Sequence, residues 1–289
     1  MTENNNKFSA LQIRRFIIAA MLVPSFSTIP AIAETSRGFI GPLEYQLPGN
    51  MAQPINILVQ YGFQDRARKS WDASGSKVGG DDVKVTVGLT KYVHAWTLES
   101  NPNINVGWEV IAPLVGVRND TARTTASGLA DPIAGGFAWF KPTPETTIGS
   151  DFLFQLPVGS SSVGGGDRWR IIQSVFGAIQ SGAFNYTADL VWDWPGTGTT
   201  TNQKSAMTWS TQHRMGYAVT PLFMPYVGLD YEYQKAKNGL PSNNEAVANL
   251  GMMFTFKPTY NLAVHYGRGF KGDNRSVTDS VNARFVFVF

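Results

Sequence analysis

The chain has 289 residues, of which 43% are hydrophobic and only 16% are charged, against about 25% charged in an average soluble domain. A soluble globule needs a charged surface, so this composition favours a protein whose outer face contacts lipid. The absence of cysteine excludes a disulfide framework, thiolate catalysis and cysteine-ligated metal sites. The formal net charge of +3 comes without a clustered basic patch, which argues against a nucleic-acid partner.

Residues 1–33 have the three parts of a secretory signal peptide. Arg14 and Arg15 precede the short apolar run Phe16–Val23, and the small-residue site Ala31–Ala33 follows it. The run is too short for a membrane-spanning helix, which needs about 20 residues. We therefore expect a cleavable signal peptide at 1–33, an irregular N-terminal segment at 34–52 and a folded domain at 53–289. The sequence leaves open whether residues 34–52 plug that domain.

From about residue 53 onward, apolar residues recur at every second position. The segments Ile55–Phe63, Val83–Leu89, Ile104–Val110 and Leu250–Phe256 all show this alternation. Such a period predicts strands whose two faces meet different surroundings. The alternating runs last about 10–15 residues, which is longer than soluble strands of five or six and suits membrane strands of about 9–11. The predicted fold is all-β, a transmembrane antiparallel up-and-down β-barrel.

Long and short connections alternate along the chain. The long ones are rich in Gly, Ser, Thr and Asn, and the short ones are tight turns such as Lys141–Glu145 and Lys257–Thr259. Outer-membrane barrels place long loops outside the cell and short turns on the periplasmic side. Counting the connections predicts about twelve strands with both ends periplasmic, an even number as single-chain bacterial barrels have.

The last strand and several aromatic residues indicate the membrane. Apolar side chains at alternate positions of the final strand would form its lipid face and resemble the signal that the outer-membrane assembly machinery recognises: Val281, Ala283, Phe285, Phe287 and Phe289. Aromatic rings prefer the membrane–water boundary, and the predicted girdle consists of Trp139, Phe223, Tyr260 and Phe287. The expected location is the bacterial outer membrane, with membrane lipid and the assembly machinery as partners.

Polar and charged side chains on the other face of the strands are expected to line the lumen. This set comprises Lys84, Glu109, Asp151, Gln155, Arg168, Arg170, Asp189, Asp193, Gln212, Arg214, Asp230, Glu232, His265, Asn282 and Arg284. Acids and bases fall mainly on neighbouring strands, so they can pair across the sheet. They either select solutes in a pore or fill a narrow lumen with ion pairs. The sequence does not decide between these two roles.

Three local predictions follow from the strand pattern. If Ser181-Gly182 is a two-residue turn, Arg170 lies directly opposite Asp193, and similar reasoning places Arg214 diagonal to Asp230. The alternation slips after Leu89, and a β-bulge near residues 90–92 would restore the outward face. The face on which His94 lies is left undetermined.

Motifs of catalysis and metal binding are absent from the sequence. The three histidines have no metal-ligand spacing, and no G-x-S-x-G sequence occurs. We therefore expect no catalytic residue, no cofactor and no metal. His213 is an exception to consider, because the alternation places it on the lipid face beside Thr211, where a lipid-modifying barrel enzyme could act.

Two short segments carry a family resemblance. Gly128-Leu129-Ala130-Asp131-Pro132 and Leu156-Pro157-Val158-Gly159 resemble the outer-membrane family named for the meta pathway of phenol degradation, over roughly residues 50–289. The resemblance implies a transporter-like barrel that imports hydrophobic substrates, and it offers no catalytic residues. The predicted function is a monomeric outer-membrane channel for small, aromatic or hydrophobic solutes, by passive diffusion. The alternatives are a lipid-modifying enzyme and a non-conducting structural or surface-interaction barrel.

Overall fold

The computed structural model describes residues 40–200 and 202–289. The predicted signal peptide and the first part of the irregular segment lie outside these residues. The strands are β1 (Ile55–Trp71), β2 (Lys77–Leu98), β3 (Asn101–Asn119), β4 (Thr124–Leu129), β5 (Ile133–Thr143), β6 (Thr146–Gln155), β7 (Arg170–Ser181), β8 (Phe184–Pro195), β9 (Thr208–Tyr217), β10 (Phe223–Gln234), β11 (Asn243–Lys257), β12 (Tyr260–Asp273), β13 (Arg275–Ser276) and β14 (Asp279–Val288). A short 3-10 helix, η2 (Ser161–Val163), lies between β6 and β7.

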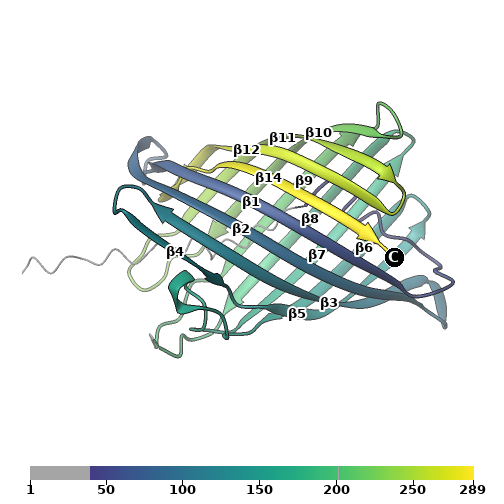
Figure 1. Ribbon diagram of the computed structural model, residues 1–289, viewed down its shortest axis with the longest axis horizontal. Coiled ribbons are helices and arrows are strands. Elements are labelled where there is room, and N and C mark those ends of the chain that lie inside the picture. Colours follow the sequence, from purple (N-terminus) through teal and green to yellow (C-terminus); the bar gives the residue numbers. More distant parts are fainter. Residues whose placement is uncertain (1–39, 201) are drawn as a thin grey trace, which may run out of the picture. The chain divides into compact units, whose positions relative to one another are not determined.

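The strands form one closed antiparallel ring. Of the fourteen strands, β4 pairs with β3 alone and β13 is a two-residue extension beside β1, which leaves twelve in the wall. β1 pairs with β2 on one side and with β14 on the other, and Figure 1 shows β14 lying along β1. Reciprocal backbone hydrogen bonds of 2.9 and 3.0 Å join Asn56 to Phe289 at the seam. The predicted barrel of about twelve strands is confirmed.

The two faces of the wall differ as the alternation predicts. Large apolar side chains point outward and remain exposed, among them Leu114, Ile148, Phe152 and Phe285. Inward positions carry buried polar groups, and the Arg214 side chain is one of the most deeply buried in the barrel. An apolar outer surface is stable only against hydrocarbon, so this is the wall of an outer-membrane barrel. Across residues 40–200 and 202–289, the structure contains no helix of the length and apolarity that crossing a membrane would require.

The direction in which the side chains of β2 point corrects one prediction. Val83 and Val85 are buried on the lumen side, whereas Lys84 is exposed on the opposite face and does not line the lumen. The pairing of β2 with β3 runs without a shift from Val83 to Thr97, so the expected bulge at residues 90–92 is wrong. The alternation never slips; apolar residues face inward along this part of β2, and that inverts the simple rule of apolar outside and polar inside.

His94 therefore lies on the outer face. Its Nδ1 is 2.9 Å from the Asn56 side-chain oxygen, and its ring lies 5.8 Å from the ring of Trp108, which is exposed on the same face. The neighbouring Tyr92 hydroxyl donates to the same Asn56 oxygen at 2.7 Å. These polar groups satisfy one another on a surface that otherwise meets lipid.

Trp139 also departs from prediction. It was expected in the outer aromatic girdle, but it is 2% exposed and points into the lumen, where its indole N–H donates to the Pro48 carbonyl at 2.8 Å. Its neighbour Phe140 takes the outward position. The physical reason is that residues 40–52 lie inside the ring and supply Trp139 with both a hydrogen-bond acceptor and apolar contacts.

Candidate functional site in the barrel lumen

Residues 40–52, called here the lumen segment, are held by inward side chains from many strands. Arg214 on β9 donates through Nε to the Ile40 carbonyl at 2.9 Å. On β8, the Asn185 side-chain oxygen accepts the Leu43 N–H at 3.1 Å. Lys141 on β5 donates to the Leu47 carbonyl at 2.8 Å. Three strands of the wall thus bind one irregular stretch of chain, which occupies the lumen.

Glu44 anchors the lumen segment by charge. Its carboxylate forms an ion pair with Arg284 on β14 and accepts the Tyr61 hydroxyl on β1 at 3.0 Å. The Arg284 guanidinium also donates to the Pro42 carbonyl at 3.3 Å. A Cβ on Gly41 would lie 2.8 Å from the guanidinium carbon, so a larger residue there would displace the Arg284 guanidinium. The ion pair joins the segment to the last strand of the barrel.

Tyr45 makes a second, chemically distinct contact. Its ring stacks on Phe176 of β7 with centroids 4.3 Å apart and planes 15° from parallel. Its hydroxyl donates to Asp189 of β8 at 3.1 Å. The other oxygen of Asp189 accepts the Gln212 backbone N–H at 3.0 Å. The phenol ring of Tyr45 therefore contacts an aromatic face, and its hydroxyl binds a buried carboxylate.

Two apolar clusters of the wall flank the lumen segment. One consists of buried residues on β1, β10, β11 and β12 and packs against Leu43: Val59, Tyr61, Met224, Tyr226, Met253 and Ala263. The other combines Ala95, Trp139 and Phe176 and packs against Tyr45, Leu47 and Met51. This part of the lumen is therefore apolar and rich in aromatic rings.

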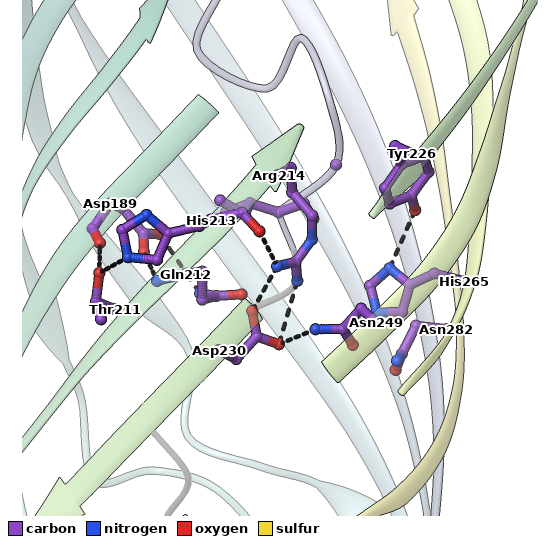
Figure 2. Close-up of polar contacts among 12 residues, drawn as sticks. Asp189, Thr211, Gln212, His213, Arg214, Tyr226, Asp230, Asn249, His265 and Asn282 are labelled. Carbon is purple, nitrogen blue, oxygen red and sulfur yellow. Dashed lines mark hydrogen bonds and ion pairs between the residues drawn. The ribbon is translucent and has the colours of Figure 1, made fainter. Parts of the chain in front are cut away.

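Ion pairs between neighbouring strands line another part of the lumen. Arg214 on β9 pairs with Asp230 on β10, and Asp230 also accepts the Asn249 amide from β11 at 2.9 Å (Figure 2). Lys91 pairs with Glu109 at 2.6 Å. Because Gln212 faces Asp230 in the ladder, Arg214 is diagonal to it, as predicted.

The pair Arg170–Asp193 forms in a different register from the predicted one. The two charges are 2.6 Å apart and buried, but Arg170 faces Pro195 and Asp193 faces Ile172. The contact is therefore diagonal, and the prediction of direct opposition is wrong. The cause is the turn, which consists of Gly182 and Ala183 between the paired residues Ser181 and Phe184, with Gly182 at φ +56°.

Other predicted lumen residues are placed as follows. Glu232 is buried and pairs with Arg275 at 2.7 Å. His265 is buried and lies 3.0 Å from the Tyr226 hydroxyl. The Asp151 carboxylate accepts the Ser174 N–H at 3.1 Å, and Gln155 donates to Asp131 at 3.3 Å. Asn282 on β14 is also buried, and its amide donates to Ser280 at 3.1 Å.

Arg168 does not belong to a strand. It precedes β7, pairs with the adjacent Asp167 at 2.6 Å and hydrogen-bonds Ser205 of the connection between β8 and β9. Its role is to join two long loops, so its assignment to the lumen wall is wrong. The alternation of residues 168 and 170 extended the strand too far toward the loop.

The outward face of β8 and β9 carries His213 in a hydrogen-bond chain. The Tyr186 hydroxyl lies 2.6 Å from His213 Nδ1. On the other side of the ring, His213 Nε2 lies 3.1 Å from the Thr211 hydroxyl (Figure 2). Thr211 itself donates to the Asp189 carbonyl at 2.5 Å. With the Thr211 proton on a backbone carbonyl, Nε2 must donate and Nδ1 must accept. Both nitrogens of the imidazole thus have hydrogen-bond partners. Because Nε2 carries a proton, it cannot accept one from the Thr211 hydroxyl.

Among residues 40–200 and 202–289, no group of His, Asp and Glu side chains is arranged to hold a metal ion. The polar atoms of the lumen instead bind one another and the lumen segment. What the geometry offers is a cavity wall with paired charges and an aromatic surface.

Comparison with known protein families shows to which family the chain belongs. A protein-family model described as "Putative MetA-pathway of phenol degradation" matches residues 40–285. The chain belongs to this family. The sequence has no match among curated proteins.

The two segments that carry the family resemblance lie together in the structure. Asp131 accepts the N–H groups of Gly159 and Gly166 at 2.7 and 2.8 Å, which holds the loop between β6 and β7 against the start of β5. A Cβ on Gly159 would lie 2.5 Å from the Ala130 carbonyl carbon. The two segments thus form a contact that we call the loop clasp. In this clasp Gly159 allows the loop backbone to approach Ala130 closely, and Asp131 supplies the hydrogen-bond acceptor.

Solved structures support the fold. An outer membrane channel from Pseudomonas putida F1 is 15% identical with a TM-score of 0.73, covering 87% of this chain and 100% of that one. The beta domain of the Bordetella autotransporter BrkA is 12% identical with a TM-score of 0.52, covering 81% and 99%. The translocator domain of autotransporter NalP from Neisseria meningitidis is 11% identical with a TM-score of 0.50, covering 82% and 89%. At these identities the likeness concerns the fold.

Sequence reasoning missed Glu44, Tyr45 and Lys91. Lys91 is missed because the rule of apolar outside and polar inside puts Val83–Leu89, and with them every odd position of β2, on the lipid face. The buried side chains of Val83 and Val85 show that these odd positions face the lumen. For Glu44 and Tyr45 the sequence offers a weak signal, a charged and an aromatic polar residue within a segment that has no strand pattern.

Proposed function

We propose that this barrel is an outer-membrane channel through which small hydrophobic or aromatic solutes diffuse passively. A closed wall with an apolar exterior and a lumen lined by aromatic side chains supports this function. Membership of the phenol-degradation family favours aromatic solutes in particular. No catalytic step is part of the proposal, because the outward His213 chain is already satisfied by hydrogen bonds.

The lumen segment is the observation on which the proposal depends. It is covalently attached to β1 but adds no strand to the wall, and side-chain contacts such as Glu44–Arg284 hold it in place. Its removal would leave the twelve-stranded ring complete. The lumen behind it is apolar at Tyr61, Phe176 and Trp139. Such a segment acts as a gate that leaves when solute passes.

The paired charges have a separate role in this proposal. Arg170–Asp193, Arg214–Asp230 and Lys91–Glu109 each bring one positive and one negative side chain together, so each pair carries no net charge. A lumen with such compensated charges does not favour an ion of either sign. We therefore propose that they stabilise a narrow barrel without selecting for cations or anions, and that solute selection lies in the aromatic part of the lumen.

Conductance of the full chain in a planar bilayer tests the proposal. Glu44→Gln removes the charge that pairs with Arg284, and we expect it to raise the open probability of single channels. Glu145→Gln, in the exposed turn between β5 and β6, is the matched control and should behave as wild type. An aromatic solute added to the open channel should reduce the ion current. Absence of conductance in both wild type and Glu44→Gln would overturn the proposal.

We also propose that the protein acts as a monomer and that Val281, Phe285, Phe287 and Phe289 guide its assembly. All four side chains point outward and are exposed on β14 or at its end, where the assembly machinery could bind them before closure. The closed ring offers no unpaired wall strand to a second copy, which supports the monomer.

A further inference from the structure

We propose that Tyr45 occupies a phenol-binding site in the lumen wall, which a free phenol fills when the lumen segment moves away. This inference rests on the proposed channel function and names the class of solute. The tyrosine side chain is itself a phenol attached through one carbon. The site is therefore described here with an internal copy of its ligand in place.

The contacts of Tyr45 are those that a small phenol requires. The ring lies 4.3 Å from Phe176 and nearly parallel to it, a favourable stacking geometry for two aromatic rings. The hydroxyl donates to Asp189 at 3.1 Å, inside a barrel where Asp189 is 5% exposed. A buried acceptor of this kind discriminates strongly between solutes with and without a hydroxyl group, because the latter leave it unpaired.

The wall holds both contacting groups without help from the lumen segment. Phe176 on β7 and Asp189 on β8 are direct partners in the antiparallel ladder, so their relative position is set by backbone pairing. On the other side of β7, Gly149 faces Phe176, and a Cβ there would lie 2.3 Å from the Phe176 ring. Glycine thus makes room for the stacking ring. The site is preformed in the wall, and departure of Tyr45 would leave it available.

The hydrogen bonds of Asp189 explain why a replacement donor is favoured. One carboxylate oxygen is held by the Gln212 backbone N–H at 3.0 Å. The other receives the Tyr45 hydroxyl and a long contact of 3.4 Å from the Gln212 amide. When Tyr45 leaves, a buried carboxylate oxygen loses its best donor. A solute that brings an aromatic ring and a hydroxyl restores both contacts at once, whereas benzene restores one.

Excision of the internal ligand provides the test. Tyr45→Ala removes the atoms of one phenol ring from the full chain, and calorimetric titration with phenol or benzene, corrected with protein-free micelles, measures what enters. We expect Tyr45→Ala to bind phenol at least about tenfold more tightly than benzene. We also expect it to bind phenol at least about tenfold more tightly than wild type, in which the tethered tyrosine competes at high effective concentration.

Three further variants make the result specific. Tyr45→Phe keeps the ring in the site and should bind phenol as weakly as wild type. Leu43→Ala removes apolar atoms at the other cluster while Tyr45 still fills the phenol site, so it should show no preference for phenol over benzene. Tyr45→Ala with Asp189→Leu should lose the preference that Tyr45→Ala alone displays. Heat-modifiable gel mobility of each variant establishes that the barrel has folded.

Equal affinity of Tyr45→Ala for phenol and benzene would overturn the phenol site, as would a preference that survives Asp189→Leu. Conductance of the same Tyr45→Ala preparation tests the channel function separately. A conducting barrel without phenol preference contradicts this inference alone. A barrel that binds phenol but never conducts contradicts the proposed function and leaves a binding site without transport.

Discussion

Asp230 on β10 accepts hydrogen bonds from Arg214 on β9 and Asn249 on β11, so a single buried carboxylate joins three strands of the wall. Arg214 in turn donates to the Ile40 carbonyl of the lumen segment. The Arg214–Asp230 ion pair therefore stabilises the wall and also positions the lumen segment. We expect its loss to change both the stability of the barrel and its conductance.

Asp230→Ala should lower the free energy of unfolding by about 3–5 kcal/mol, because it leaves the Arg214 charge buried without a partner. The measurement is denaturant unfolding of the refolded barrel, followed by gel mobility. Asp120→Ala is the control, since its pair with Arg118 is largely exposed and such pairs contribute at most about 1 kcal/mol. Replacing both partners, with Arg214→Met and Asp230→Leu, should cost less than Asp230→Ala. Similar losses for Asp230→Ala and Asp120→Ala would refute this role.

Gly159→Ala should release the loop between β6 and β7. The new Cβ would lie 2.5 Å from the Ala130 carbonyl carbon and 2.6 Å from the Asp131 nitrogen, so the clasp on Asp131 cannot close. We expect faster trypsin cleavage after Arg168 in the reconstituted protein. Gly62→Ala is the control, because its Cβ would meet no atom within 4 Å. Unchanged cleavage in Gly159→Ala would show that the clasp does not hold the loop.

Phe289 allows barrel closure and assembly to be separated. A chain truncated after Val288 loses both hydrogen bonds to Asn56, and we expect the refolded barrel to be less stable by about 1–3 kcal/mol. Phe289→Ala keeps these bonds, so it should refold normally in detergent. If the side chain guides assembly, Phe289→Ala should reduce the amount of barrel that reaches the outer membrane of cells. Normal amounts in cells would remove Phe289 from the assembly signal.

His213→Ala should leave lipid hydrolysis at the background of empty vesicles, as in wild type. The hydrogen-bond chain from Tyr186 through His213 to Thr211 ends on the Asp189 carbonyl, so His213 serves to satisfy polar groups that face lipid. The assay is release of fatty acid from phospholipid vesicles containing the protein. A hydrolytic activity in wild type that His213→Ala abolishes would establish the enzyme alternative.

The sequence predicts the barrel well because its period of two, its alternating loops and its apolar last strand are local signals. It fails where facing depends on what occupies the lumen. Trp139 points inward toward apolar neighbours, and Val83 is buried while Lys84 beside it is exposed. The rule of apolar outside and polar inside therefore assigns Lys84 and Trp139 to the wrong faces. The pair Arg170–Asp193 was found although the turn was placed one residue early, since long side chains reach diagonal partners.

The seam between β1 and β14 has a consequence for biogenesis. Pairs such as Ile57 with Val288 connect opposite ends of the barrel sequence, so the wall cannot close until its last strand has been made. Before that moment, every intermediate sheet has two free edges and an apolar outer surface, both prone to aggregation. Safe delivery of the unfolded chain is thus as much a requirement of this architecture as the strands themselves.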